Sequence, residues 1–215
     1  MDSRKQNLTT FNSAYAAELV EKIGTKVNFK AFPRGKRIFL SATQPNKIYV
    51  IRSGIIAIHR QPDDILMGYL EAPTIRGMAN AYHSNLRFQS EYIIKVVESV
   101  ELAVIEREAF YTLLHELQLW DVYAKILEMN ISILGDHIFK HLSPTVYDVV
   151  RIRLPELMSE PDSVRNSVTV EEYIRSKTRL SRSRIMQILS ELRVAGYIKT
   201  EKGYLVWVKE LPKAF

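Results

Sequence analysis

The spacing of the apolar residues changes along the chain, and this change limits the possible folds more than any other feature. Between residues 28 and 106, short β-branched and aromatic runs alternate with turn sequences such as Pro33-Arg34-Gly35 and Gln44-Pro45-Asn46. Such runs predict strands, here over residues 37–40, 47–52, 55–59, 65–70, 92–97 and 101–105. Because parallel strands need long crossover connections, strands this close in sequence are expected to pair antiparallel. Residues 28–106 therefore predict a β-sandwich or β-barrel.

Helical spacing precedes this region, within residues 1–27. Its apolar residues recur every three or four positions, which predicts one short amphipathic helix ending near Gly24; they are Leu8, Phe11, Tyr15, Leu19 and Ile23.

Helical spacing returns over residues 107–142, as one short element and then a long helix with two apolar faces. One face holds Tyr123, Leu127, Ile131, Leu134, Ile138 and Leu142, and the other holds Ile126, Asn130, Ile133 and His137. A helix with two apolar faces must pack twice, and a second copy of the chain is the simplest second partner. We expect a dimer seam that includes Leu127, Asn130, Leu134 and Ile138, in which Asn130 sets the register. The alternative is that both faces are buried within one monomer.

Residues 143–215 predict a winged helix-turn-helix. Ser143-Pro144 ends the long helix. Thr169 and Glu172 fit a capping box at the start of one helix, and Ser181 is the expected N-cap of a second helix that Gly196 ends. Two runs around Thr200–Gly203 then predict a β-hairpin. The second helix of such a motif is placed for the major groove of DNA.

The charge supports this interpretation. The net charge is +6, and residues 143–215 hold 13 basic and 9 acidic residues, a balance of +4. No acidic residue lies between Arg175 and Met186. Basic patches attract phosphate, arginine binds guanine and glutamine binds adenine. We therefore expect Arg182 and Gln187 to contact bases, and Arg175, Lys177, Arg179 and Lys202 to contact phosphates. The alternative is a helical hairpin with a solvated basic face.

The order of these parts resembles the cyclic-AMP-receptor/fumarate-nitrate-regulator (CRP/FNR) family of bacterial transcription factors. The similarity is strongest over residues 180–192, and Phe32–Gly35 with Ile51–Gly54 are similar to the family's first strands and glycine turn. Residues 173–178 and 196–198 are closer to an enterobacterial subgroup named for inhibition of hydrogen peroxide resistance.

The resemblance implies an α+β fold: a β-roll like that of cyclic-nucleotide-binding domains, a long dimerisation helix, and the winged helix-turn-helix. The implied boundaries are 1–27 for the first helix, 28–106 for the roll, 107–142 for the dimerisation helix and 143–215 for the DNA-binding domain. The resemblance also implies that Ser181, Arg182 and Arg184 contact phosphates or base edges. It implies that Ser183 and Gln187 occupy the two base-reading positions.

The chain departs from the family at the nucleotide pocket. Ile75-Arg76-Gly77-Met78 lacks the family's glutamate, and Arg87-Phe88-Gln89-Ser90 lacks its Arg-Ser pair. We therefore expect a vestigial pocket around Arg76, Gly77, Arg87 and Ser90 that binds no cyclic nucleotide. The alternative is that an unidentified small molecule binds in the roll and controls DNA binding.

The sequence gives little support for disulfides, metal sites or catalysis. The chain has no cysteine, which excludes disulfides, thiolate zinc sites and cysteine-ligated iron–sulfur clusters. His137 and His141 have the spacing of two metal ligands, but no glutamate follows the first. His59 and His83 are isolated, so no enzyme, metal or cofactor is expected.

The short apolar runs predict no membrane span, and the amino terminus lacks the apolar segment of a secretory signal, so a cytoplasmic protein is expected. The expected partners are double-stranded DNA and a second copy of the chain, with RNA polymerase as a further candidate. A protein-interaction module with secondary DNA contact is the remaining alternative.

Overall fold

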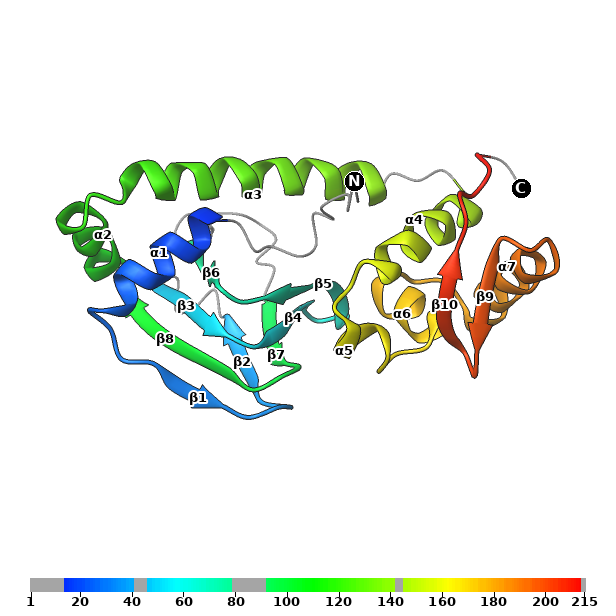
Figure 1. Ribbon diagram of the computed structural model, residues 1–215, viewed down its shortest axis with the longest axis horizontal. Coiled ribbons are helices and arrows are strands. Elements are labelled where there is room, and N and C mark those ends of the chain that lie inside the picture. Colours follow the sequence, from blue (N-terminus) through cyan, green and yellow to red (C-terminus); the bar gives the residue numbers. More distant parts are fainter. Residues whose placement is uncertain (1–13, 41–45, 79–91, 142–144, 214–215) are drawn as a thin grey trace. The chain divides into compact units, whose positions relative to one another are not determined.

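The computed structural model describes residues 14–40, 46–78, 92–141 and 145–213 (Figure 1). Among these residues the chain divides into two compact units, and the division falls between Ser132 and Ile133. The division lies within the long helix rather than at its expected end near residue 142. No helix in the described ranges is both long enough and apolar enough to cross a bilayer.

The first unit is a β-roll with three helices. Its elements are α1 (Ala14–Gly24), β1 (Lys30–Phe32), β2 (Arg37–Leu40), β3 (Lys47–Ser53), β4 (Ile55–Arg60), β5 (Ile65–Glu71), β6 (Thr74–Arg76), β7 (Tyr92–Val96), β8 (Val100–Glu106), α2 (Arg107–Glu116) and the part of α3 (Trp120–His141) up to Ser132. The strands form two four-stranded sheets in the orders β1-β8-β3-β6 and β2-β7-β4-β5, and every pair is antiparallel as expected.

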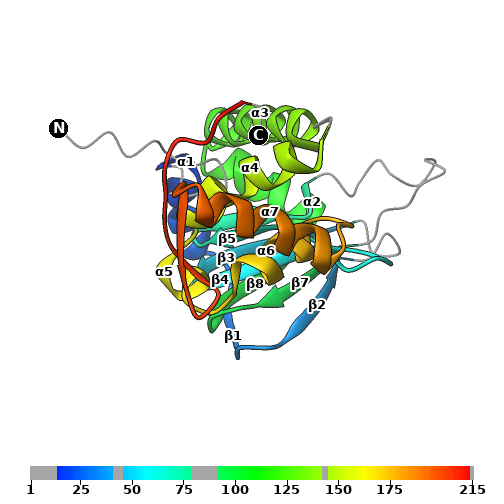
Figure 2. The ribbon, with the colours of Figure 1, turned by 90° about the vertical axis from the view of Figure 1, so that its right-hand side faces the viewer.

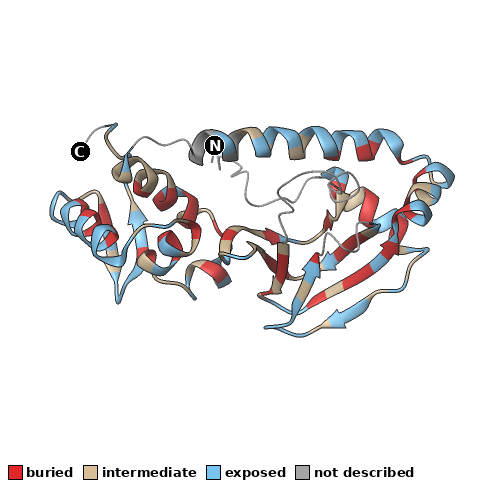
Figure 3. Cartoon of the chain, turned by 180° about the vertical axis from the view of Figure 1, so that it is seen from behind, coloured by how far each residue is buried: buried red, intermediate tan, exposed pale blue. Residues whose placement is uncertain are grey.

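Two apolar layers stabilise this unit, and strand β3 lies between them. Ile48 and Val50 point to one side, where they pack with buried residues of all three helices. Tyr49 and Ile51 point to the other side, into the layer shared by the two sheets. Successive side chains of a strand face opposite ways, so a strand that is apolar throughout can serve both layers. The buried residues follow the strands of the sheets in Figure 3.

Gly54, between β3 and β4, is a tight point of this roll. Its φ is +90°, and a Cβ there would lie 2.2 Å from the Ser99 carbonyl oxygen and 2.8 Å from Val100 Cγ1. The strands on either side can therefore close only around a residue without a side chain.

After the end of α3, the described residues of the second unit form four helices and a hairpin. They are α4 (Val146–Met158), α5 (Asp162–Arg165), α6 (Val170–Lys177), α7 (Arg182–Val194), β9 (Ile198–Glu201) and β10 (Tyr204–Val208). Helix α4 continues through Pro155. Proline removes one N–H from the helix, and the burial of Val150, Leu154 and Leu157 along the same helix outweighs that loss.

We predict that Gly54→Ala destabilises the first unit by about 2–4 kcal/mol, from a strained φ together with overpacking. The control is Gly68→Ala on β5, where an added Cβ meets no atom within 4 Å, and a change within about 0.5 kcal/mol is expected. Trp120 and Trp207 are the two tryptophans, so denaturant unfolding followed by Trp120 fluorescence in a Trp207→Phe background reports on this unit. Equal midpoints for the two alanine variants would contradict the prediction.

Candidate nucleic-acid interface

Side-chain caps determine where α6 and α7 begin. Thr169 Oγ1 accepts from the Glu172 amide at 3.3 Å, and the Glu172 carboxylate accepts from the Thr169 amide at 2.9 Å. This is the expected capping box. Ser181 Oγ accepts from the Arg184 amide at 3.4 Å, as expected for the N-cap of α7. The chain between the two caps therefore forms a short helix, a turn and a second helix.

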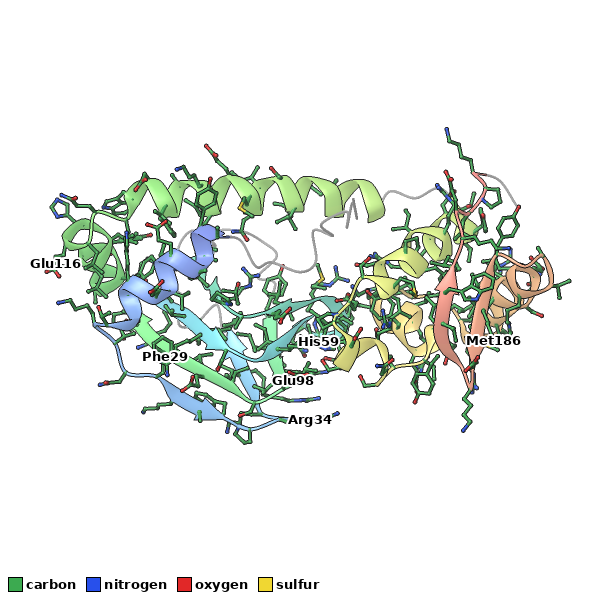
Figure 4. All side chains as sticks on the ribbon, viewed as in Figure 1. Phe29, Arg34, His59, Glu98, Glu116 and Met186 are labelled. Carbon is green, nitrogen blue, oxygen red and sulfur yellow. The ribbon has the colours of Figure 1, made fainter. Side chains whose placement is uncertain are left out.

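Helix α7 has one buried face and one exposed face. Ile185, Ile188, Leu189 and Leu192 are buried in the unit. Arg182, Ser183 and Gln187 are exposed, as is Met186, which Figure 4 labels. Figure 2 shows α7 across the front of this unit, with α6 beside it. The exposed side chains are therefore presented together along one side of a rigid helix.

The hairpin forms the wing. Lys202 and Gly203 have φ values of +51° and +90°, which fit the two-residue turn that joins β9 to β10. The Gly203 carbonyl accepts a hydrogen bond from the Val170 amide at 2.9 Å, which holds the wing tip against the start of α6. Lys202 is exposed at this tip.

Four of the predicted phosphate-binding cations are exposed on this unit: Arg175 on α6, Arg179 in the turn, Arg184 on α7 and Lys202 on the wing. The Arg175 guanidinium lies 2.7 Å from the Glu171 carboxylate, one turn away on α6. The Arg175 side chain is open to solvent, which screens the pair, so phosphate can compete with the carboxylate.

The structure corrects the expected role of Lys177. Its side chain is buried, with 2% of its surface exposed. The ammonium donates to Glu156 Oε1 at 2.8 Å and lies 3.6 Å from Glu160. An ammonium enclosed in this way cannot reach a DNA phosphate, so Lys177 instead stabilises the interior of the domain.

Lys177 belongs to a buried polar cluster that the sequence did not indicate. Arg153 donates to Glu156 Oε2 at 2.7 Å, and the Tyr173 hydroxyl donates to Glu160 at 2.6 Å. Burial favours a higher pKa for Glu156, but the charges of Lys177 and Arg153 outweigh it and lower the pKa to about 2. Burial dominates at Glu160 and raises its pKa, although Lys177 and Tyr173 oppose the rise. Glu156 is therefore the anion that Lys177 and Arg153 share.

Comparison with known proteins agrees with this geometry. Residues 146–213 match the family model described as winged helix-turn-helix DNA binding. The chain is 27% identical over 212 residues to the inhibitor of hydrogen peroxide resistance of Escherichia coli K12, covering 91% of this chain and 92% of that one. It is 28% identical over 211 residues to the Salmonella typhimurium protein of the same name, with the same coverage.

Solved structures of other proteins have a similar fold over most of this chain. The global regulator CLP of Xanthomonas campestris superimposes with a TM-score of 0.61 at 17% identity, covering 90% of this chain and 99% of that one. A transcriptional regulator of the crp/fnr family from Eubacterium rectale gives 0.60 at 15% identity, with coverages of 92% and 91%. This chain has the CRP/FNR fold. The resemblance found in the sequence is confirmed, and so is the winged helix-turn-helix.

In this CRP/FNR fold, α3 carries the predicted dimer seam. Ile131, Leu134 and Ile138 are 70%, 61% and 52% exposed, and Leu127 is also exposed. Asn130 lies at the edge of this stripe: it lines a small cavity with Ile126, Thr74 and Arg76, and its side-chain amide donates to the Ile126 carbonyl at 2.6 Å. Asn130 therefore contacts its own β-roll, and its place in the dimer seam stays a prediction.

The residues of the predicted vestigial pocket have structural roles where the structure describes them. The Arg76 guanidinium donates to the Ile75 carbonyl at 2.9 Å, and burial lowers its pKa to about 10. The Gly77 carbonyl accepts from Arg107 at 2.6 Å. Arg87 and Ser90 lie outside the described residues.

No group of three or more potential metal ligands occurs among the residues that the structure describes. The side chains of His137 and His141, and the whole of His83, lie outside that part of the chain.

We predict that Lys177→Met destabilises the second unit by about 3–5 kcal/mol, because it removes one partner of a buried ion pair. Lys202→Met is the control, since it removes an exposed ammonium, and a change within about 0.5 kcal/mol is expected. Unfolding is followed by Trp207 fluorescence in a Trp120→Phe background. Equal stability of the two methionine variants would show that the buried pair does not hold the domain together.

Proposed function

We propose that this protein is a homodimeric, sequence-specific DNA-binding regulator of transcription. The comparisons support the coarser statement, a DNA-binding regulator of CRP/FNR type. The observation that carries the proposal is the exposed face of α7, where Arg182, Ser183 and Gln187 stand opposite a fully buried apolar face. A helix held in this way can enter the major groove with its polar side chains toward the base edges.

The proposed contacts follow from side-chain chemistry and position. Arg182, Ser183 and Gln187 read base edges, and the amide of Gln187 suits adenine. Five further groups bind phosphate: Arg175, Arg179, Ser181, Arg184 and Lys202. Ser181 and Arg184 stand at the amino-terminal end of α7, where backbone N–H groups also favour an anion. Lys177 is withdrawn from this set because its ammonium is buried.

Dimerisation is proposed from the apolar stripe on α3. Four apolar side chains exposed at helical spacing, Leu127, Ile131, Leu134 and Ile138, form a continuous seam. Pairing across a two-fold axis presents two α7 helices to DNA. The operator is then expected to be roughly palindromic, with half-site centres about 34 Å apart.

The first unit is proposed to act without a cyclic nucleotide. The Arg76 guanidinium and the Gly77 carbonyl are bonded within the protein rather than directed at a ligand. A link to oxidative stress is proposed from the name of the enterobacterial relatives, and no catalytic activity is proposed.

We predict that selection from random duplex DNA, with no added ligand, enriches a palindrome. Gln187→Ala should then cost about 1–3 kcal/mol on the operator and little on random DNA, because it removes a base contact. Lys202→Met should weaken binding to all sequences alike and reduce the slope of log K against log salt by about 0.9. Salt-sensitive binding without any enriched sequence would contradict sequence-specific recognition in the absence of an effector.

We predict that Leu134→Asp converts the dimer to a monomer at micromolar concentration, because it places two carboxylates in the apolar seam. Sedimentation velocity measures this directly. The matched control is Val104→Asp, which changes another exposed apolar residue, on β8 of the roll, and should remain dimeric. A dimeric Leu134→Asp variant would show that α3 is not the seam.

A further inference from the structure

Three side chains on one flank of α7 are joined by hydrogen bonds. Arg184 Nη1 donates to Gln187 Oε1 at 3.1 Å, and Gln187 Nε2 donates to Glu191 Oε1 at 3.1 Å. Spacings of three and four residues place these side chains next to one another on a helix. All three also line the same surface cavity of about 340 Å³. Their shared orientation thus follows from both the helix period and the shape of the surface.

This arrangement determines which way the Gln187 amide points. A guanidinium can only donate hydrogen bonds, and an ionised carboxylate can only accept them. A flipped amide would place its NH₂ against Arg184 and its oxygen against Glu191, and both hydrogen bonds would be lost. The oxygen of Gln187 therefore stays on the side of Arg184, and its nitrogen stays on the side of Glu191.

The hydrogen bonds that remain free on this amide match one base. Gln187 keeps one lone pair on Oε1 and one N–H on Nε2, because Arg184 and Glu191 each use one. Adenine presents a donor at N6 and an acceptor at N7 in the major groove. Guanine presents two acceptors, O6 and N7, and binding both would take both N–H groups of Gln187. While Nε2 stays bonded to Glu191, the fixed amide can therefore bind both groups of adenine but only one acceptor of guanine.

We propose that Glu191 is a positioning residue that sets the Gln187 amide to read adenine. The inference rests on the proposed function, in which Gln187 contacts a base. Glu191 rather than Arg184 has this role, because Arg184 is also a candidate phosphate ligand and its bond to Gln187 is lost when it turns to the backbone. The bond to Glu191 remains, since a carboxylate has no attraction to phosphate.

The test measures binding to four duplexes that differ only at the base pair read by Gln187. That pair is identified as the position where Gln187→Ala removes discrimination. Wild-type protein is expected to prefer adenine to guanine by about tenfold or more. Glu191→Ala should reduce this preference about threefold to tenfold, the equivalent of one lost hydrogen bond. Glu191→Gln should retain most of it, because the new amide oxygen still accepts from Gln187 Nε2.

Two controls separate positioning from charge. In a Gln187→Ala background, Glu191→Ala should leave the remaining pattern of base preference unchanged, because there is no amide to position. Glu201→Ala removes an exposed carboxylate from the wing of the same unit, and should raise affinity for all four duplexes by one common factor.

The inference is overturned if Glu191→Ala and Glu191→Gln raise affinity equally on all four duplexes, since that result means charge repulsion alone. It is also overturned if the preference for adenine survives Glu191→Ala unchanged. Failure of the proposed function gives a different result: wild-type protein would show no discrimination at any position of any duplex, and Glu191 could then have no base to select.

Discussion

The ion pair between Glu156 and Lys177 is the contact on which the DNA-facing part of the molecule depends. Glu156 lies near the end of α4, and Lys177 is the last residue of α6. Removing two charges from water is costly unless they meet with good geometry, so the pair restricts how these two helices can pack. The turn to α7 begins at the next residue. The ion pair and the buried apolar face of α7 therefore act together to set the orientation of α7, and with it the proposed base contacts.

Helices α7 and α3 show how one sequence pattern can lead to opposite results. Both carry apolar residues at spacings of three and four. In α7 these residues are buried against neighbouring elements of the same unit, which leaves the polar face outward. In α3 the side chains of Leu127, Ile131, Leu134 and Ile138 stay exposed, whereas Val122, Tyr123 and Ile126 of the same helix are buried in the core of the first unit. The pattern shows that a helix has an apolar face, and the rest of the fold decides what covers it.

Local patterns predicted most of the secondary structure. The six expected strands, the capping box at Thr169 and the N-cap at Ser181 depend on residues within a few positions of one another. Strands β1 and β6 were missed, because three residues are too short to show an alternating pattern, and the four-residue helix α5 was missed for the same reason. The basic stretch from Arg175 to Arg184 was correctly placed on the helix-turn-helix, but charge alone could not show which of its members face solvent.

The sequence by itself determined the order of the elements, the polar composition of the exposed face of α7 and the turn chemistry of the wing, since each depends on neighbours along the chain. The tertiary structure decided the role of Lys177 and the surroundings of Asn130. Lys177 lies 21 residues from its carboxylate partner Glu156, and Asn130 lines a cavity together with a strand more than fifty positions away. Burial results from contacts between distant segments. A cation at the end of a helix therefore gives the same sequence pattern whether it contacts DNA or a buried carboxylate.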